Sequence, residues 1–298
     1  MHPAPSTDTS LNLLNCGFAP MQFGISTHLY HGSRLDRDHL VEIAAHGFEA
    51  VEIFATRTHF DYHDERAVAV IGEHLADARL RPHAVHAPTS EGFTAGVWGP
   101  AYSIAHGVEA NRRRAVDETL AAITAAYRLG AGLVVLHPGI PTAQGPEPRD
   151  NRRDAFIASV EELQRAAQPL GVRLALEVIP NPIGDAETLV SLLEDELEID
   201  GLGICLDSGH ARMLGDVTEA VETASGYLVT THLHDNDGRR DDHRVPFDGA
   251  INWPSVMMSF RKIGYEGTWM FELAGDRPRD VLEKAARARR KLEGLLTS

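Results

Sequence analysis

The sequence predicts an α/β fold, a single (β/α)₈ TIM barrel, and the main evidence is a regular alternation of two kinds of segment. Eight short apolar or β-branched runs alternate with longer amphipathic stretches. Such strict alternation implies parallel strands joined by right-handed crossovers, and eight of these units close into a barrel. An open doubly wound sheet is the alternative, but the segment GISTHLYHG at 24–32 lacks the glycine-rich phosphate loop usual in that fold.

Each predicted element has definite bounds. The strand-like runs lie at 22–26, 50–53, 82–85, 132–136, 173–177, 202–206, 227–232 and 268–272. The helix-like stretches lie at 37–47, 65–79, 109–130, 152–171, 185–197, 217–225, 253–264 and 279–296. The longest irregular stretches follow strands, where a barrel keeps its functional loops; they are 87–110, 138–150 and 234–252.

The chain of 298 residues is long enough for one barrel. We predict a flexible extension at 1–20 and a barrel catalytic domain at 21–298. Residues 1–20 lack the basic and long apolar regions of a secretory signal, and two cysteines cannot make a disulfide framework. No apolar run reaches the length of a membrane span. We therefore expect a cytoplasmic protein, without a membrane partner.

The balance of charge bears on the partner. The chain carries 43 acidic and 28 basic side chains, a net charge of −15. Nucleic-acid binding draws mainly on Lys and Arg contacts to phosphates, so this balance counts against a nucleic-acid partner. We expect a small polar substrate, and a homo-oligomer is compatible with the sequence.

Functional groups in a barrel project from the carboxyl ends of its strands. The polar residue that ends each apolar run is a carboxylate or an imidazole in all eight cases: His28, Glu52, His86, His137, Glu177, Asp207, His232 and Glu272. Crowded at one mouth, such groups are costly to desolvate unless a cation neutralises them. Carboxylate oxygen and imidazole nitrogen suit Mn²⁺, Mg²⁺, Co²⁺, Zn²⁺ or Fe²⁺. We therefore predict a divalent-metal site at this mouth.

Four segments resemble the xylose isomerase-like TIM-barrel superfamily, which includes sugar isomerases and epimerases and the endonuclease IV-type AP endonucleases. They are ALEV at 175–178, CLDSGH at 205–210, THLHDNDG at 231–238 and MFEL at 270–273. The resemblance runs from about residue 21 to the C-terminus. In the isomerase branch it implies one metal held by Glu177, Asp207, a histidine of the seventh strand and Glu272, and we expect manganese as the first candidate ion.

The resemblance also implies a reaction. Glu177 and Glu272 would move a carbon-bound proton through a metal-stabilised enediolate, and His210 would contact the substrate. The expected enzyme is a divalent-metal-dependent isomerase or epimerase acting on a sugar, sugar phosphate or cyclitol. A sugar-active lyase or dehydratase would use the same metal site.

The histidine of the seventh strand is ambiguous. His232 and His234 are two residues apart, so their side chains share one face of the strand. We prefer His232 as the metal ligand because it ends the apolar run, and we expect His234 to support the site or contact the substrate.

The resemblance to endonuclease IV gives a second hypothesis. In this branch, four further residues would be ligands: His86, His137, Asp241 and His243. They complete the nine ligand positions of a three-metal phosphodiesterase, of which the other five are Glu177, Asp207, His210, His232 and Glu272. The loop HAPTSEGF at 86–93 departs from that family, and we find no basic, aromatic loops for DNA. The residues that could bind substrate or further metal are therefore His86, His137, His210, His234, Asp241 and His243.

Overall fold

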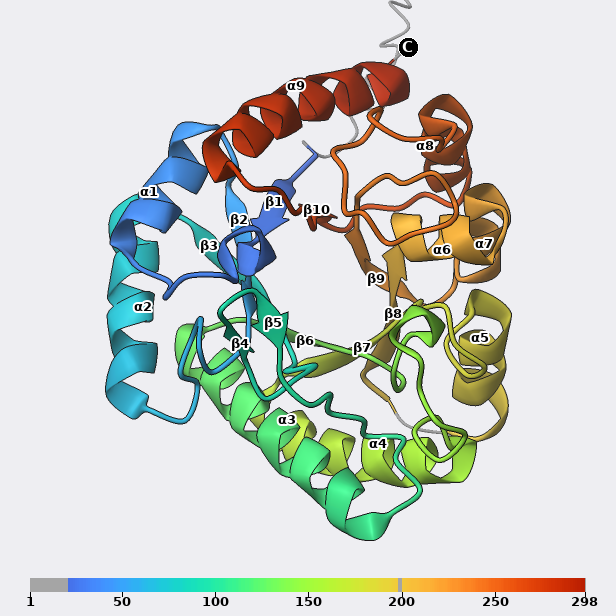
Figure 1. Cartoon of the computed structure of the whole chain (residues 1–298). Coiled ribbons are helices and arrows are strands. Elements are labelled where there is room, and N and C mark those ends of the chain that lie inside the picture. Colours follow the sequence, from blue (N-terminus) through green and yellow to red (C-terminus); the bar gives the residue numbers. More distant parts are fainter. Residues whose placement is uncertain (1–20, 198–199, 298) are drawn as a thin grey trace, which may run out of the picture.

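The computed structural model describes residues 21–197 and 200–297, and these residues confirm the predicted barrel (Figure 1). Eight parallel strands follow one another around it in the order β10-β1-β2-β3-β6-β7-β8-β9. Their bounds are β1 (Phe23–Ser26), β2 (Ala50–Phe54), β3 (Arg81–His86), β6 (Leu133–Leu136), β7 (Arg173–Glu177), β8 (Leu202–Asp207), β9 (Leu228–His232) and β10 (Trp269–Phe271). Leu233 closes the ring, because its backbone N–H donates to Met270 O at 2.7 Å across the β9–β10 seam. The predicted extension at 1–20 lies outside the described residues.

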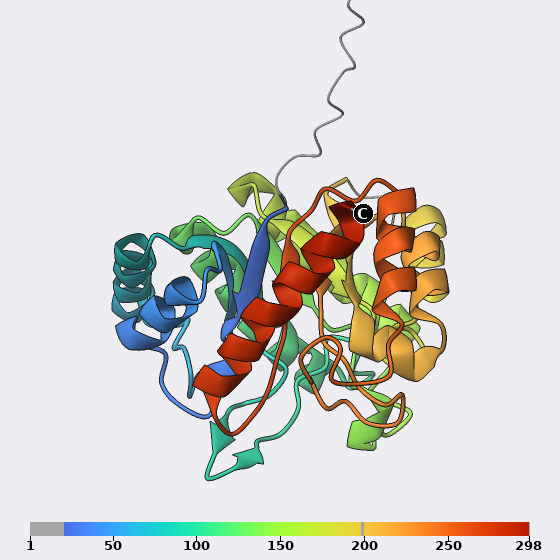
Figure 2. The ribbon, with the colours of Figure 1, turned by 90° about the horizontal axis from the view of Figure 1, so that it is seen from above.

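Helices surround the strands in the expected alternation (Figures 1 and 2). The main ones are α1 (Arg37–Ala45), α2 (Glu65–Ala78), α3 (Glu109–Leu129), α4 (Arg153–Ala167), α5 (Ala186–Asp195), α7 (Val217–Thr223), α8 (Trp253–Lys262) and α9 (Pro278–Thr297). Aspartate side chains accept backbone N–H groups at the start of several of them, which satisfies donors that a helix leaves free; these are Asp36, Asp64, Asp185 and Asp216. No helix among residues 21–197 and 200–297 combines the length and apolar character needed to cross a bilayer.

The predicted irregular stretch 87–110 contains a β-hairpin that the sequence analysis missed. Its strands are β4 (Phe93–Thr94) and β5 (Val97–Trp98), and they pair antiparallel. The two residues between them, Ala95 and Gly96, have φ values of 51° and 80°, as a tight two-residue hairpin turn requires. Strands of two residues are too short to show an alternating pattern, which is why the prediction failed here.

Short helices also flank the strand ends. They are η1 (Thr27–Tyr30), η2 (Thr142–Gln144), η3 (Gln168–Leu170) and α6 (Ser208–Leu214). The predicted end of the second strand needs correction as well. Strand β2 continues to Phe54, so Glu52 lies in the middle of the strand rather than at its end. Because side chains alternate along a strand, Glu52 and Phe54 share one face.

Candidate active site

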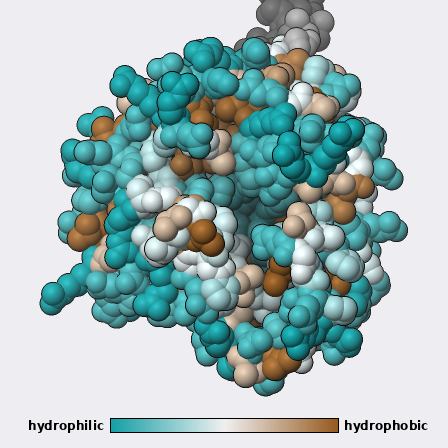
Figure 3. All heavy atoms as spheres, in the orientation of Figure 1, coloured by the Kyte–Doolittle hydropathy of each residue, from teal (hydrophilic) through white to brown (hydrophobic). Residues whose placement is uncertain are grey.

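The carboxyl ends of the strands surround a cavity of about 430 Å³. Figure 3 shows a hollow near the middle of this largely hydrophilic face. Predicted site residues line much of the cavity: His28, His86, His137, His210, Asp241, His243 and Glu272. The loops that follow the strands therefore enclose a polar cavity large enough for a small molecule.

One group of side chains joins the ends of four neighbouring strands, and all four are at most 3% exposed. Glu177 ends β7, Asp207 ends β8, His232 ends β9 and Glu272 follows β10. The Nδ1 atom of His232 lies 3.2 Å from Glu272 Oε2 and 3.4 Å from Glu177 Oε1. It lies 4.0 Å from Asp207 Oδ2. Three buried carboxylates thus converge on one imidazole nitrogen.

The donor atoms of this group fit a divalent cation. His232 Nε2 lies 3.0 Å from Glu52 Oε2, an acceptor, so this nitrogen carries the proton. When a cation is bound, that tautomer would leave Nδ1 with a lone pair directed at it; without the cation, neighbouring anionic groups outweigh burial and raise the pKa of His232 well above its ordinary value. Glu177 Oε1 and His232 Nδ1 are buried without a hydrogen-bond partner. Carboxylates and a neutral imidazole that share one buried point are a ligand set for Mn²⁺, Zn²⁺ or a similar ion.

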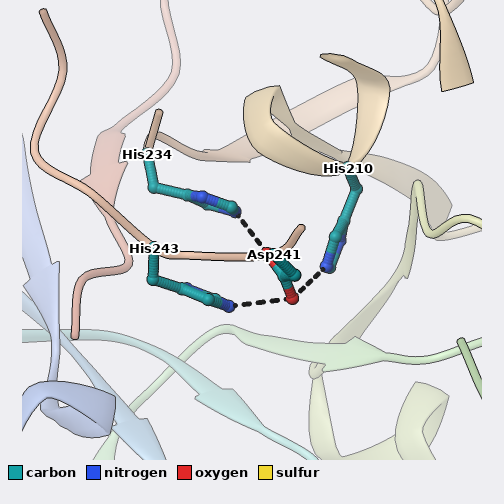
Figure 4. Close-up of side chains that lie close together, drawn as sticks. All are labelled: His210, His234, Asp241 and His243. Carbon is teal, nitrogen blue, oxygen red and sulfur yellow. Dashed lines mark hydrogen bonds and ion pairs between the residues drawn. The ribbon is translucent and has the colours of Figure 1, made fainter. Parts of the chain in front are cut away.

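Figure 4 shows a second group, formed by His210, His234, Asp241 and His243. Asp241 Oδ2 is 3.1 Å from His210 Nε2 and 3.2 Å from His243 Nε2. His234 Nε2 is 3.7 Å from Asp241 Oδ1, and its ring stacks on that of His243 with centroids 4.1 Å apart. His234 Nε2 is also 2.9 Å from the Asp207 carboxylate, which links the two groups. Three imidazoles around one carboxylate could hold a second cation.

A third group shares Glu177. His86 Nε2 and His137 Nε2 each lie 3.1 Å from Glu177 Oε2. The other oxygen of the same carboxylate, Oε1, faces His232. Glu177 therefore stands between two sets of possible ligands, which is how a carboxylate bridges two cations.

Charge pairing in this mouth shifts the ionisation of its members. Burial lowers the pKa of His86, but the hydrogen bond and the charge of Glu177 outweigh it and raise this pKa to about 9. Burial also opposes the charge of His243, and Asp241 raises its pKa to about 10. Although burial raises the pKa of Glu177, the charges of His137 and His232 bring it well below its ordinary range. Imidazolium groups thus balance the carboxylates, and a divalent cation could replace their protons in this role.

The loop that carries Asp241 and His243 is held by one buried carboxylate. Asp235 Oδ2 accepts from Trp253 Nε1 at 2.8 Å and from Phe247 N at 3.0 Å. Its Oδ1 accepts from Asn236 N at 2.9 Å and Ile251 N at 3.1 Å. Hydrogen bonds from both ends of the loop to one side chain define the loop's path. Sequence reasoning missed this role because three of the four partners lie 12, 16 and 18 residues further along the chain.

The structure places all ten predicted metal or substrate residues in these three groups. His232 joins the carboxylates of the first group, and His234 joins the second. Sequence reasoning missed other residues that line the cavity, because no motif marks them; they are Phe54, Thr89, Ser90, Trp98 and Gln144.

The eight-stranded barrel, with carboxylates and imidazoles at its mouth, places this chain in the class of α/β-barrel enzymes. Comparison with known sequences gives the family, because residues 40–295 match the xylose isomerase-like TIM barrel family. The chain belongs to this family.

Individual relatives agree with this assignment. The uncharacterized protein MJ1311 of Methanocaldococcus jannaschii is 29% identical over 259 residues, which cover 85% of this chain and 83% of that protein. The inosose isomerase of Bacillus licheniformis is 26% identical over 177 residues, covering 55% of this chain and 62% of the relative. Among solved structures, a D-tagatose 3-epimerase-like protein is similar, with a TM-score of 0.74 and 27% identity, over 93% of this chain and 97% of the other. The protein is therefore an enzyme of a family that includes sugar isomerases and epimerases.

Proposed function

We propose that this enzyme is a divalent-metal-dependent isomerase or epimerase acting on a sugar, sugar phosphate or cyclitol. The observation that carries the proposal is the approach of Glu177 and Glu272 to the same nitrogen of His232, at 3.4 and 3.2 Å. Two carboxylates at one buried point can remove a proton from a substrate carbon and return one. The names of the inosose isomerase and tagatose epimerase-like relatives support the choice of substrate class.

The proton transfers need carboxylates that are ionised at neutral pH. Burial alone would favour the neutral acids, but the charge of His232 helps to bring the pKa of both Glu177 and Glu272 well below its ordinary range. Glu272 lines the cavity, so it can reach a bound substrate directly. Glu177 is fully buried, lies 3.1 Å from both His86 Nε2 and His137 Nε2, and would complete the ligand set. Each carboxylate can therefore accept a proton and later release it.

The cation would be held by Glu177, Asp207, His232 and Glu272. When bound, it would supply Lewis acidity that lowers the pKa of the C–H bond next to the substrate's carbonyl. Around it, His210 lines the cavity and lies 3.1 Å from Asp241, which positions this imidazole to contact a substrate hydroxyl. Mn²⁺ is our first choice of ion, because it favours oxygen-rich ligand sets, and this set offers three carboxylates and one imidazole.

A second candidate function is phosphodiester hydrolysis by several metal ions. The specific support is the presence of two further ligand groups, one around Asp241 and one formed by His86, His137 and Glu177. Metal ions about 4 Å apart can activate water and stabilise a leaving oxygen. We place this function second because the net charge of −15 disfavours a nucleic-acid substrate.

The proposal is tested by following sugar interconversion. Purified enzyme is incubated with D-tagatose, D-psicose, D-fructose, an inosose and the 6-phosphates of the ketoses, and the products are separated by chromatography. A chelator is then added, and Mn²⁺, Mg²⁺, Co²⁺, Zn²⁺ and Fe²⁺ are restored one at a time. We expect conversion of at least one compound, its loss on chelation and its recovery with metal. Conversion that continues at the same rate after chelation, or no conversion of any compound, would contradict the proposal.

A further inference from the structure

One wall of the cavity is aromatic. It is formed by Trp98 on β5, Phe54 at the end of β2 and His31 after η1. The Trp98 ring stacks on His31 with centroids 4.9 Å apart and planes at 21°, and it meets Phe54 edge-on at 6.1 Å. Trp98 nevertheless remains 40% exposed. An indole that is held on one side and open on the other offers a flat surface to a ligand.

One ring of this aromatic wall, Phe54, connects it to the proposed catalytic groups. Phe54 contacts Trp98 on one side and lies 5.2 Å from the ring of His86 on the other. His86 in turn contacts Glu177. A substrate that touches Trp98 can therefore extend to Glu272, which lines the same cavity.

The hairpin that carries Trp98 is fixed along its length. The backbone N–H of Glu91 donates to Pro100 O at 3.0 Å, and that of Tyr102 donates to Thr89 O at 2.9 Å. These bonds extend the antiparallel pairing beyond β4 and β5. Phe93 N donates to Thr58 Oγ1 at 2.9 Å, and this bond ties the hairpin to the loop after β2. The position of the indole is thus set before a ligand arrives, which lowers the entropic cost of binding.

The cavity offers little to a phosphate group. In the described part of the chain, no lysine or arginine lines it, and the charged imidazoles that do line it are already paired with carboxylates, His86 with Glu177 and both His210 and His243 with Asp241. The uncharged polar side chains that do line it are Thr89, Ser90 and Gln144. Phosphate recognition relies on cationic side chains or helix N-termini, and the carboxylates Asp241 and Glu272 at the cavity would repel a dianion.

We propose that the substrate is an unphosphorylated sugar or cyclitol whose C–H face packs on Trp98. This inference rests on the proposed isomerase function and narrows its substrate class, because it excludes sugar phosphates. The C–H bonds of a polyol present apolar surface to an aromatic ring, while its hydroxyl groups need polar partners. Ser90 and Gln144 supply such partners around the same wall.

Tryptophan fluorescence gives a direct test that does not depend on turnover. The chain has three tryptophans, and Trp253 and Trp269 are only 1% and 2% exposed. A change of emission on sugar binding therefore reports on Trp98. Manganese-loaded enzyme is titrated with D-tagatose, D-psicose, D-fructose, an inosose and fructose 6-phosphate, and affinities are also measured by calorimetry.

We expect the unphosphorylated compounds to change the emission and the 6-phosphate to bind at least about tenfold more weakly than fructose. Trp98→Phe should abolish the emission change and keep most of the affinity. Trp98→Ala should weaken binding about tenfold, the effect of losing one aromatic contact. The matched control is Val97→Ala on the same hairpin, because neighbouring side chains of a strand point to opposite faces; it should bind as the wild type does.

Three results would overturn the inference: wild-type affinity in Trp98→Ala, tighter binding of the 6-phosphate than of fructose, or no binding of any unphosphorylated compound. These results are distinct from failure of the proposed function. Isomerisation of a sugar phosphate would leave the proposed function standing and remove this inference. Binding on Trp98 without any conversion would remove the isomerase proposal and leave the binding site.

Discussion

The imidazole of His232 lies between two carboxylates, with Nε2 3.0 Å from Glu52 Oε2 and Nδ1 3.2 Å from Glu272 Oε2. Glu52 is fully buried and reaches His232 from β2, on the side away from the other three carboxylates. It thereby fixes which nitrogen carries the proton and leaves the other to bind a cation. Carboxylates that hold a ligating histidine in this way tune metal affinity.

The first prediction concerns this contact. Glu52→Gln should lower the affinity of the enzyme for Mn²⁺ by about 10- to 100-fold, because an amide can also present its N–H to Nε2 and no longer selects one tautomer. The affinity is measured by competition with a chelator. Glu49→Gln, an exposed site just before the same strand, is the control and should bind normally. If Glu52→Gln bound Mn²⁺ as tightly as the control, the positioning role would be refuted.

The second prediction separates the two histidines of the seventh strand. His232→Ala should lose the cation held with Glu177 and Glu272, because Nδ1 of His232 is the nitrogen that faces their carboxylates. His234→Ala should retain that cation, since its Nε2 faces Asp207 and Asp241. Metal content per chain is measured by mass spectrometry after dialysis against Mn²⁺. Loss of metal from His234→Ala alone would show that the ligand assignment is wrong.

The third prediction concerns the loop held by Asp235. Asp235→Asn replaces one acceptor oxygen by an N–H₂ group that would face the N–H donors of Phe247 and Trp253. Because the site is fully buried, we expect a loss of about 2–4 kcal/mol in the free energy of unfolding. Urea denaturation provides the measurement. Asp248→Asn, an exposed change in the same loop, should cost less than about 1 kcal/mol, and equal losses in the two variants would argue against a special role for Asp235.

The fourth prediction concerns pH and His59, which contacts Thr27 of η1 and Ser33 after it. Its Nδ1 donates to Ser33 O at 2.6 Å and its Nε2 accepts from Thr27 Oγ1 at 3.1 Å. Burial lowers the pKa of His59 to about 4, so folding favours the neutral ring. Its stabilising effect is complete above the unfolded pKa of about 6.5 and declines as the pH falls toward 4.

Between pH 7 and pH 5 the free-energy difference between wild type and His59→Gln should therefore shrink by about 2 kcal/mol. Urea denaturation at both pH values measures it. The exposed Val70 gives a control variant, Val70→Ala, which removes no titratable group, so its difference from the wild type should be nearly constant. A constant difference for His59→Gln as well would contradict the effect of burial.

The barrel was predictable because its signal repeats. The run RLALE at 173–177 coincides with β7, and most other predicted strands differ from the observed ones by a residue at one end. Buried parallel strands read as apolar runs, and helices between them keep the 3.6-residue period. The β4–β5 hairpin carries neither signal. Its conformation depends on the Ala95–Gly96 turn and on contacts with Thr58, which is distant in sequence.

Some residues of the site could likewise be predicted from the sequence, and others could not. Residues that end strands, such as Glu177 and Asp207, could be predicted because the fold fixes where strand ends meet. The role of Glu52 could not, because it depends on the direction of a side chain across the barrel to His232. Trp98 belongs to a loop with no regular pattern, so only its three-dimensional contacts show that it lines the cavity.

The most direct test of the central claim is exchange of a carbon-bound hydrogen with solvent. Manganese-loaded enzyme is incubated in heavy water with D-tagatose, D-psicose, D-fructose and an inosose, and deuterium next to the carbonyl carbon is followed by NMR. In parallel, the same preparation receives a DNA duplex with one abasic site. We predict exchange into at least one sugar, no cleavage of the duplex, and rates at least about 10³-fold lower in Glu177→Gln and Glu272→Gln. Cleavage of the duplex at nanomolar enzyme, without exchange into any sugar, would contradict the account and favour a phosphodiesterase.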